Sequence, residues 1–75
     1  GGEMKIFNEE DTISKERAIQ LTVQRETPHK VLEARIGQYN QSPIWEVSFE
    51  QENGSIGYAS FSLTSGEWIR TVKNI

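Results

Sequence analysis

The sequence contains no cysteine, only one histidine and no long apolar run, and each shortage excludes a class of protein. Without cysteine the chain can form neither a disulfide framework nor a thiolate metal site. No apolar stretch approaches the ~20 residues that a membrane-spanning helix requires, and no secretion signal is recognisable. What is left is a small domain that must be stabilised by one hydrophobic core.

Positive charge is also scarce, with eight Lys and Arg residues against eleven Asp and Glu residues and a net charge of −3. The basic residues are scattered along the chain. A protein that binds nucleic acid gathers its basic residues into a patch that displaces counterions from phosphate. A polybasic segment that binds a membrane surface would also be visible as a cluster. We therefore expect neither nucleic acid nor a membrane surface as a direct partner of this segment.

A chain of 75 residues is long enough for one domain. Such a chain buries only about 60% of its unfolded surface, so few buried positions remain for a catalytic site. Most of the seven aromatic residues lie in the second half of the sequence. This distribution favours a thin two-layer fold without a deep enclosed pocket.

The N-terminal residues 1–12 show little hydrophobic periodicity and are interpreted as a linker or a cloning remnant, and residues 13–75 as the folded domain. The acidic cluster Glu9, Glu10 and Asp11 lacks the alternating oxygen ligands and central glycine of a calcium loop. We interpret it as solvated charge that favours the N-terminus of a following helix. No metal or other cofactor is expected.

A helix is predicted to begin after Ser14, because a serine hydroxyl can accept hydrogen bonds from the free amides of the first turn. Ile13 and Ala18 are placed to form a hydrophobic staple around this cap. The helix should end at Thr27-Pro28, since proline disfavours the helical conformation of the residue before it. Its apolar band comprises Ala18, Ile19, Leu21, Thr22 and Val23.

Four strand-like segments follow, with an alternation of apolar and polar residues that predicts one buried and one exposed face. They cover Lys30–Tyr39, Ile44–Glu50, Ile56–Leu63 and Glu67–Val72. The residues predicted to face the helix are Leu32, Ala34 and Ile36, then Trp45, Val47 and Phe49, then Ala59, Phe61 and Leu63. Because the connections are short, we expect an α+β fold in which the helix packs on a four-stranded antiparallel meander.

Two glycine positions carry more specific predictions. Asn53-Gly54 is typical of a type I′ hairpin turn, which needs two positive φ angles. Gly57 lies inside a predicted strand, where glycine indicates a bulge or a close approach, here by the helix.

The helix start Ile13-Ser14-Lys15-Glu16-Arg17-Ala18-Ile19 and the hairpin Leu63-Thr64-Ser65-Gly66-Glu67-Trp68-Ile69 resemble motifs of the PepSY domain family. Pro43-Ile44-Trp45-Glu46-Val47 is similar to the PepSY-like envelope proteins of the YpmB type, which carry tandem cystatin-like domains behind a membrane anchor. The resemblance covers residues 13 to about 72. Ser62 replaces an aspartate of the family pattern, so no role of that carboxylate is carried over.

The resemblance implies a domain outside the cytoplasm, anchored to the membrane through a segment that is not in this sequence. PepSY domains occur in propeptides of secreted metallopeptidases, which they are thought to inhibit or chaperone, and in envelope proteins of unassigned role. The implied partner is therefore a protein, either a peptidase or a sister domain of the same chain. The alternative role is a structural spacer that packs against such a sister domain.

The residues themselves do not assemble into a catalytic site. His29 follows Pro28 in a connection and has no neighbouring metal-ligand motif, so we expect an exposed loop residue. Glu46 and Glu50 share the exposed face of one strand, where two solvated carboxylates stay equivalent and cannot divide acid and base roles. The serines lack a nucleophile elbow. We expect that the domain is not an enzyme.

The remaining candidate is an interaction surface on the exposed sheet face. Ser48, Tyr58 and Ser60 are predicted to point to this face, and Tyr39 and Trp68 are added as aromatic contacts. Trp45 alternates with Val47 and Phe49 and is assigned to the core, whereas Trp68 beside a turn fits either the core or an interface. A largely uncharged sheet face or a free strand edge could dock a partner.

Overall fold

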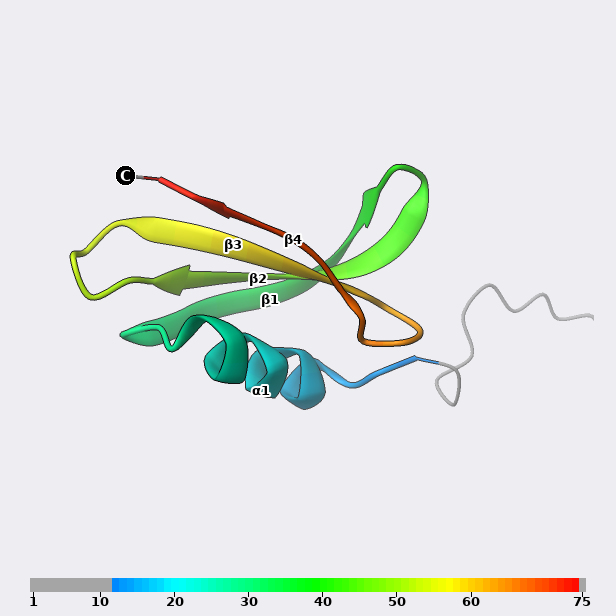
Figure 1. The fold of residues 1–75 in the computed structure, drawn as a ribbon. Helices are drawn as coiled ribbons and strands as arrows, with labels where there is room; N and C mark the ends of the chain where they lie inside the picture. The colour runs from blue at the N-terminus through cyan, green and yellow to red at the C-terminus, as the bar shows by residue number, and fades with distance from the viewer. Residues whose placement is uncertain (1–11, 75) are drawn as a thin grey trace, which may run out of the picture.

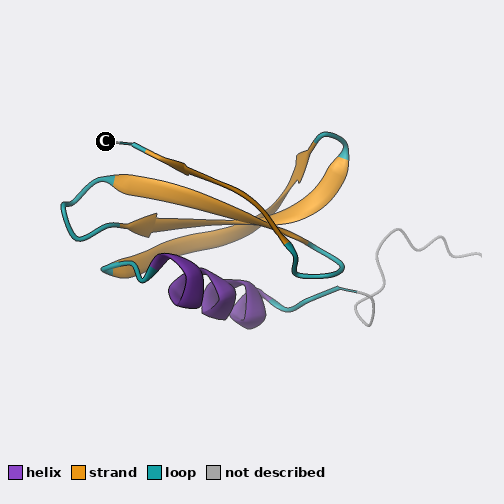
Figure 2. Ribbon diagram, in the orientation of Figure 1, coloured by secondary structure: helices purple, strands orange, loops and turns teal. Residues whose placement is uncertain are grey.

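The computed structural model describes residues 12–74, which form one α-helix followed by four β-strands (Figures 1 and 2). The elements are α1 (Lys15–Glu26), β1 (Lys30–Tyr39), β2 (Ser42–Glu50), β3 (Ile56–Ser62) and β4 (Trp68–Lys73). The sheet has the order β1-β2-β3-β4 with every neighbouring pair antiparallel. The predicted α+β meander is confirmed. The acidic cluster Glu9, Glu10 and Asp11 lies outside the described residues.

Both ends of α1 follow the prediction. The Ser14 hydroxyl oxygen accepts a hydrogen bond of 3.0 Å from the amide of Arg17, as expected of an N-cap. At the other end Thr27 adopts the left-handed conformation with φ of 44°, and its amide donates to the carbonyl of Val23. Pro28 follows and prevents the helix from continuing.

The core lies between α1 and one face of the sheet. Ala18 packs with Ala34 and Val47, and a second cluster combines Phe49, Ala59 and Phe61. Thr22 is fully buried, and its hydroxyl donates to the carbonyl of Ala18 at 2.9 Å, which satisfies the polar group inside the helix. The predicted apolar band was wrong at Val23, which is exposed, because the helix buries a narrower stripe.

A β-bulge in β1 changes the predicted buried face of this strand. Val31 pairs with Phe49 and Glu33 with Ser48, so Leu32 is an extra residue that has no partner in the register. Leu32 is 47% exposed, and Val31 packs on the core in its place. Ile36 does lie on the helix side, opposite Trp45, but it is also largely exposed. A strict alternation cannot predict a bulge, since one inserted residue reverses the faces.

A tight turn with two positive φ angles, the kind predicted for Asn53-Gly54, is found instead between β1 and β2. Its residues are Asn40 (φ of 52°) and Gln41 (φ of 68°). At Asn53-Gly54 the type I′ prediction was wrong, because only Gly54 has a positive φ, of 90°. A longer loop is closed there by a hydrogen bond from the Gln51 amide to the Ser55 carbonyl and by the side chain of Asn53, which accepts from the Ser55 amide.

Gly57 marks a close approach, although not one by the helix. It pairs with Phe49 across β2 and β3, and a Cβ atom at this position would lie 2.5 Å from the Cζ atom of the Phe49 ring. The absence of a side chain at residue 57 therefore leaves the space that the tip of the fully buried Phe49 ring occupies.

Candidate functional site

The face of the sheet that points away from α1, called here the outer face, carries four of the five predicted contact residues. Tyr39, Ser48, Tyr58 and Ser60 lie on it, and Ser48 and Tyr58 are direct cross-strand partners. Trp68 does not join them. It pairs with Phe61 and therefore lies on the helix side of the sheet.

The outer face is hollow because the β1–β2 hairpin curls over it, as Figure 1 shows at the tip of that hairpin. The Arg70 guanidinium in β4 lies 4.9 Å from the ring centroid of Tyr39 in β1, so the two edge strands meet across the sheet. Ile44 is buried beneath this contact and Ser60 is only 6% exposed. The prediction of Ser60 as an exposed contact residue is therefore corrected.

Apolar groups remain accessible beside this hollow. Tyr58 is 38% exposed and pairs with Val72, which is exposed to a similar extent. The hollow has a volume of about 430 Å³ and is lined by Arg35, Gln38, Tyr39, Ile44, Glu46, Tyr58, Ser60, Arg70 and Val72. It thus combines an apolar floor with a rim of charged side chains, an arrangement that resembles the anatomy of protein interfaces.

The carboxylates of β2 are engaged in ion pairs with β1. Glu46 Oε1 lies 3.4 Å from Arg35 Nε, and Glu50 Oε1 lies 3.9 Å from Lys30 Nζ. Each is paired with a cation of the neighbouring strand. Among residues 12–74 no group of three or more His, Cys, Asp or Glu side chains is placed to hold a metal ion. His29 is exposed.

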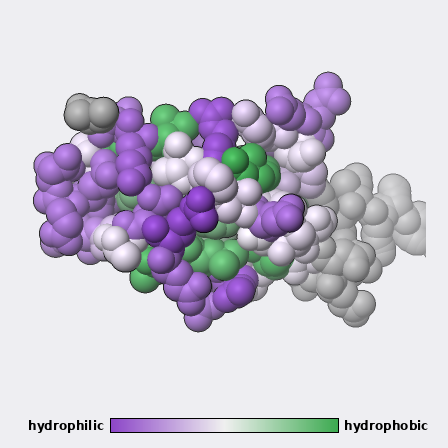
Figure 3. Space-filling view, in the orientation of Figure 1, coloured by the Kyte–Doolittle hydropathy of each residue, from purple (hydrophilic) through white to green (hydrophobic). Residues whose placement is uncertain are grey.

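A second concave surface lies on the other side of the sheet, between α1 and β4. The helix packs on β1 and β2, and an open groove of about 870 Å³ separates it from β4. In the space-filling view, apolar surface is visible between hydrophilic groups where α1 and β4 face each other (Figure 3). The groove is lined by Leu21, Gln24, Arg25, Glu26, Phe61, Gly66, Trp68, Thr71 and Lys73.

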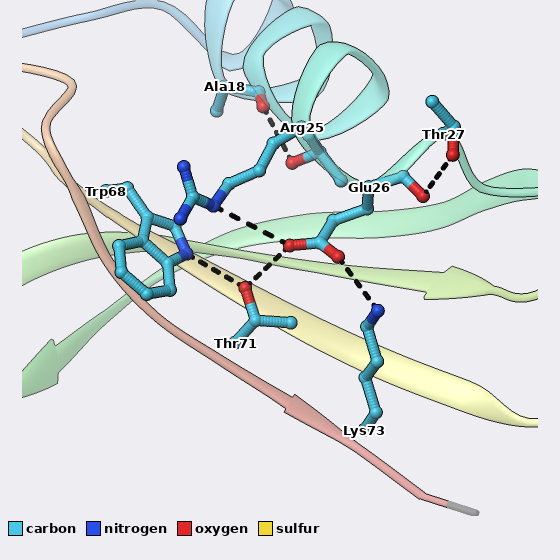
Figure 4. A network of polar contacts seen from close by, with 8 residues as sticks. Ala18, Arg25, Glu26, Thr27, Trp68, Thr71 and Lys73 are labelled. Atoms are coloured by element: carbon cyan, nitrogen blue, oxygen red, sulfur yellow. Dashed lines mark hydrogen bonds and ion pairs between the residues drawn. The ribbon is translucent and has the colours of Figure 1, made fainter.

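A polar network crosses this groove (Figure 4). The Thr71 hydroxyl accepts a hydrogen bond of 2.9 Å from Trp68 Nε1 and donates one of 2.8 Å to Glu26 Oε2. The other carboxylate oxygen, Glu26 Oε1, lies 3.2 Å from Lys73 Nζ. The Glu26 side chain is only 8% exposed, so this network satisfies a nearly buried charge.

Arg25 completes the wall of the groove. Its guanidinium carbon lies 3.7 Å from the centroid of the Trp68 ring, and its Nε lies 3.8 Å from Glu26 Oε2. Cation–π contacts of this kind hold an aromatic ring in place while leaving part of it accessible. Trp68 is 44% exposed, so it is both fixed and open to solvent.

Sequence reasoning did not find this network. One signal was present, because an acid in the last turn of a helix is disfavoured by the macrodipole and suggests a cationic partner. Glu26 is such an acid, and Lys73 supplies the cation from the opposite end of the chain.

Trp45 packs on the core, as predicted from its alternation with Val47 and Phe49. It packs against the cluster of Ala18 and Val47, and its Nε1 donates a hydrogen bond of 3.0 Å to the carbonyl of Ile13. The Ile13 amide in turn donates to the carbonyl of Leu63. These contacts attach the segment before α1 to the sheet.

These features define a two-layer α+β domain with a curled four-stranded sheet that is hollowed on its outer face and bounds a groove on its helix side. No family model matches the chain, and no curated protein matches its sequence. Among solved structures the chain is similar to the YpmB protein from Bacillus subtilis, with a TM-score of 0.83 at 16% sequence identity. The match covers 91% of this chain and 53% of the YpmB chain, so this chain spans about half the length of that protein. The fold is thus YpmB-like. In the part of the chain described, no helix is long and apolar enough to span a membrane.

Proposed function

We propose that this chain is a PepSY-like domain without catalytic activity that binds another protein outside the cytoplasm, and that the hollow outer face is its docking surface. The observation that carries the proposal is the accessible pair Tyr58 and Val72 beside the buried Ile44 floor. Tyrosine in a partly desolvated hollow is a preferred contact residue of protein interfaces.

The absence of catalysis is argued from the residues in hand. The carboxylates Glu46 and Glu50 are each ion-paired on an open sheet, and His29 is exposed in a connection. An acid–base pair requires two groups held in different environments, and a nucleophile requires a base within hydrogen-bonding reach. Neither arrangement can be built from these side chains.

The location outside the cytoplasm is part of the proposal and follows from the PepSY resemblance. In the full-length protein a membrane anchor would lie in a segment outside this sequence. Membrane fractionation of native cells combined with protease accessibility in intact cells tests it. Digestion of the domain in intact cells is the expected result, and a protected cytoplasmic protein would contradict the proposal.

The docking surface can be tested with one variant and a matched control. Tyr58→Arg places a charge in the outer face, and Val23→Arg places the same side chain on the exposed side of α1 at a similar exposed fraction. Chemical crosslinking of the native full-length protein in cells should yield a protein adduct with the control and lose it with Tyr58→Arg. Loss with both variants, or with neither, would contradict the proposal.

A finer version holds that the partner is a peptidase. Addition of the purified domain to a secreted metallopeptidase should then lower its activity in a saturable way, and Tyr58→Arg should remove the effect. Digestion of the domain without inhibition would contradict this version while leaving protein binding in place.

A second role, that of a structural spacer, is favoured by the length comparison, since the YpmB chain extends well beyond the matched half. A sister domain would then cover the outer face. The crosslinking experiment separates the two roles, because a spacer gives an adduct within one chain and a docking module gives an adduct with a different protein.

A further inference from the structure

Among the described residues 12–74, β4 forms an edge of the sheet, and no further strand pairs with its outward backbone groups. It lies at the end of the strand order, and its pairing with β3 includes a hydrogen bond of 3.0 Å from the Asn74 amide to the Ile56 carbonyl. Hydrogen-bonded pairs recur at every second residue of an antiparallel ladder. Counting back from Asn74, the backbone N–H and C=O of Val72 and Arg70 therefore face β3. The N–H and C=O of Thr71 and Lys73 face the free edge.

A strand added at this edge would find an aromatic anchor already in place. Trp68 is held by its hydrogen bond to Thr71 and by the Arg25 guanidinium stacked on its ring, yet it is 44% exposed. A side chain that is fixed before binding loses little conformational entropy when a partner covers it. Leu21 and Phe61 supply further apolar lining in the same groove.

The lining of the groove beside β4 has a small positive net charge, because Arg25 and Lys73 outnumber Glu26, with which both are paired, and the exposed Glu67 lies outside this lining. Arg25 and Lys73 line the groove with side chains that are nearly half exposed, and β4 itself carries Arg70 on its other face. Among the residues that line the groove, Glu26 is the acid, and it is almost buried in its network. The chain as a whole has a net charge of −3. This edge therefore favours an acidic partner.

We infer that the β4 edge and the adjoining α1–β4 groove bind an extended acidic segment of another protein, which pairs with β4 as a fifth strand. Strand addition supplies backbone hydrogen bonds, and alternate side chains of the added strand supply specificity. Acidic side chains on the helix side would meet Arg25 and Lys73, and an apolar side chain on that side would contact Trp68. The inference rests on the proposed protein-binding role and adds a second surface and the chemistry of the segment bound there.

The competing explanation is that the basic residues only protect the edge from aggregation, as charges on edge strands commonly do. A second copy of the chain is a further possible occupant, although pairing of two β4 edges would bring like charges together. Both explanations predict that an acidic peptide does not bind specifically at β4.

The test is a nuclear magnetic resonance titration of the isotopically labelled 75-residue chain. The probe is the synthetic peptide acetyl-Glu-Thr-Leu-Thr-Glu-Thr-Glu-amide, in which Glu and Leu share one face of the extended strand, and its counterpart carries Lys in place of each Glu. The acidic peptide should shift the amides of β4 and protect those of Thr71 and Lys73 from hydrogen exchange. The basic peptide should do neither, and this comparison needs no variant that might fail to fold.

A variant pair assigns the binding to the groove. Arg25→Gln with Lys73→Gln, made in a Glu26→Gln background so that no nearly buried carboxylate is left unpaired, should weaken acidic-peptide binding by about tenfold, the loss expected for two partly exposed ion pairs. Lys15→Gln with Arg17→Gln in the same background removes the same charge from the exposed first turn of α1 and should leave binding unchanged.

Several results would overturn the inference: equal binding of both peptides, protection at β1 instead of β4, equal loss with both variant pairs, or the same shifts on raising the concentration of the chain without peptide. Tyr58→Arg separates this inference from the proposed docking face. If the Tyr58→Arg variant loses the cellular adduct but still binds the peptide, both surfaces are supported. If the wild-type chain forms the cellular adduct but does not bind the peptide, only the β4 site is contradicted.

Discussion

Thr71 in β4 donates a hydrogen bond of 2.8 Å to the Glu26 carboxylate at the end of α1, across a sequence separation of 45 residues. The same hydroxyl accepts from Trp68 Nε1. One oxygen atom therefore joins the helix, the last strand and the exposed tryptophan. The helix packs mainly on β1 and β2. This contact, together with the Glu26–Lys73 ion pair and the stacking of Arg25 on Trp68, connects α1 to the far edge of the sheet.

Thr71→Val keeps the shape of the side chain and removes its hydroxyl. Glu26 then loses one donor but keeps Lys73, and the partly exposed Trp68 loses an acceptor, so the free energy of unfolding should fall by about 0.5–1.5 kcal/mol, the net contribution of a typical hydrogen bond. Urea denaturation measures the change. Thr71→Ser retains the hydroxyl and should recover most of the stability. Equal losses in the two variants would show that the hydroxyl does not stabilise the fold.

Gly57→Ala should destabilise the domain through the Phe49 ring. A Cβ atom at residue 57 would lie 2.5 Å from Cζ of that ring, and overpacking of a core costs typically about 1–3 kcal/mol. Gly37→Ala is the matched control, because a Cβ atom at Gly37 in β1 meets no atom within 4 Å. Thermal denaturation of the two variants should differ clearly, and a similar midpoint for both would contradict the close approach.

Ser60→Arg and Tyr58→Arg should affect the fold differently, although both residues lie on the outer face. Ser60 is buried beneath the curled hairpin, so a charged side chain there would displace Tyr39 or remain desolvated at a cost of several kcal/mol. Tyr58 is partly exposed, and its variant should unfold within about 1 kcal/mol of the wild type. Urea denaturation of both variants tests the difference. Equal stability would mean that the hairpin does not cover Ser60.

The features that the sequence predicts are those that depend on neighbours along the chain. The Ser14 cap, the helix end at Thr27-Pro28 and the alternation of Trp45, Val47 and Phe49 each rest on a few adjacent residues. With short connections they are sufficient to predict one helix on a four-stranded meander, as the structure has it.

The features that were missed depend on distant parts of the chain. Ser60 is buried in a hollow that Tyr39 and Arg70 also line, although these two come from opposite edges of the sheet. The bulge at Leu32 is visible only in the pairing of β1 with β2. The placement of Trp68 on the helix side follows from the irregular register between β3 and β4. None of these has a local pattern, so the sequence could predict an exposed face but not its shape.

The two tryptophans offer a test of how the domain is held together at its two ends. Trp45 Nε1 donates to the carbonyl of Ile13, and Trp68 Nε1 donates to Thr71. Replacing either by Phe removes one hydrogen bond, so each variant should lose about 0.5–1.5 kcal/mol in the free energy of unfolding, together with some packing.

The local effects of the two tryptophan variants on hydrogen exchange should differ. Trp45→Phe should speed hydrogen exchange of the Ile13 amide, which donates to Leu63, and leave exchange of the Asn74 amide unchanged. Trp68→Phe should speed exchange at Asn74, which pairs with Ile56, and leave Ile13 unchanged. Exchange that rises equally at both ends in both variants would mean that the domain opens only as a whole.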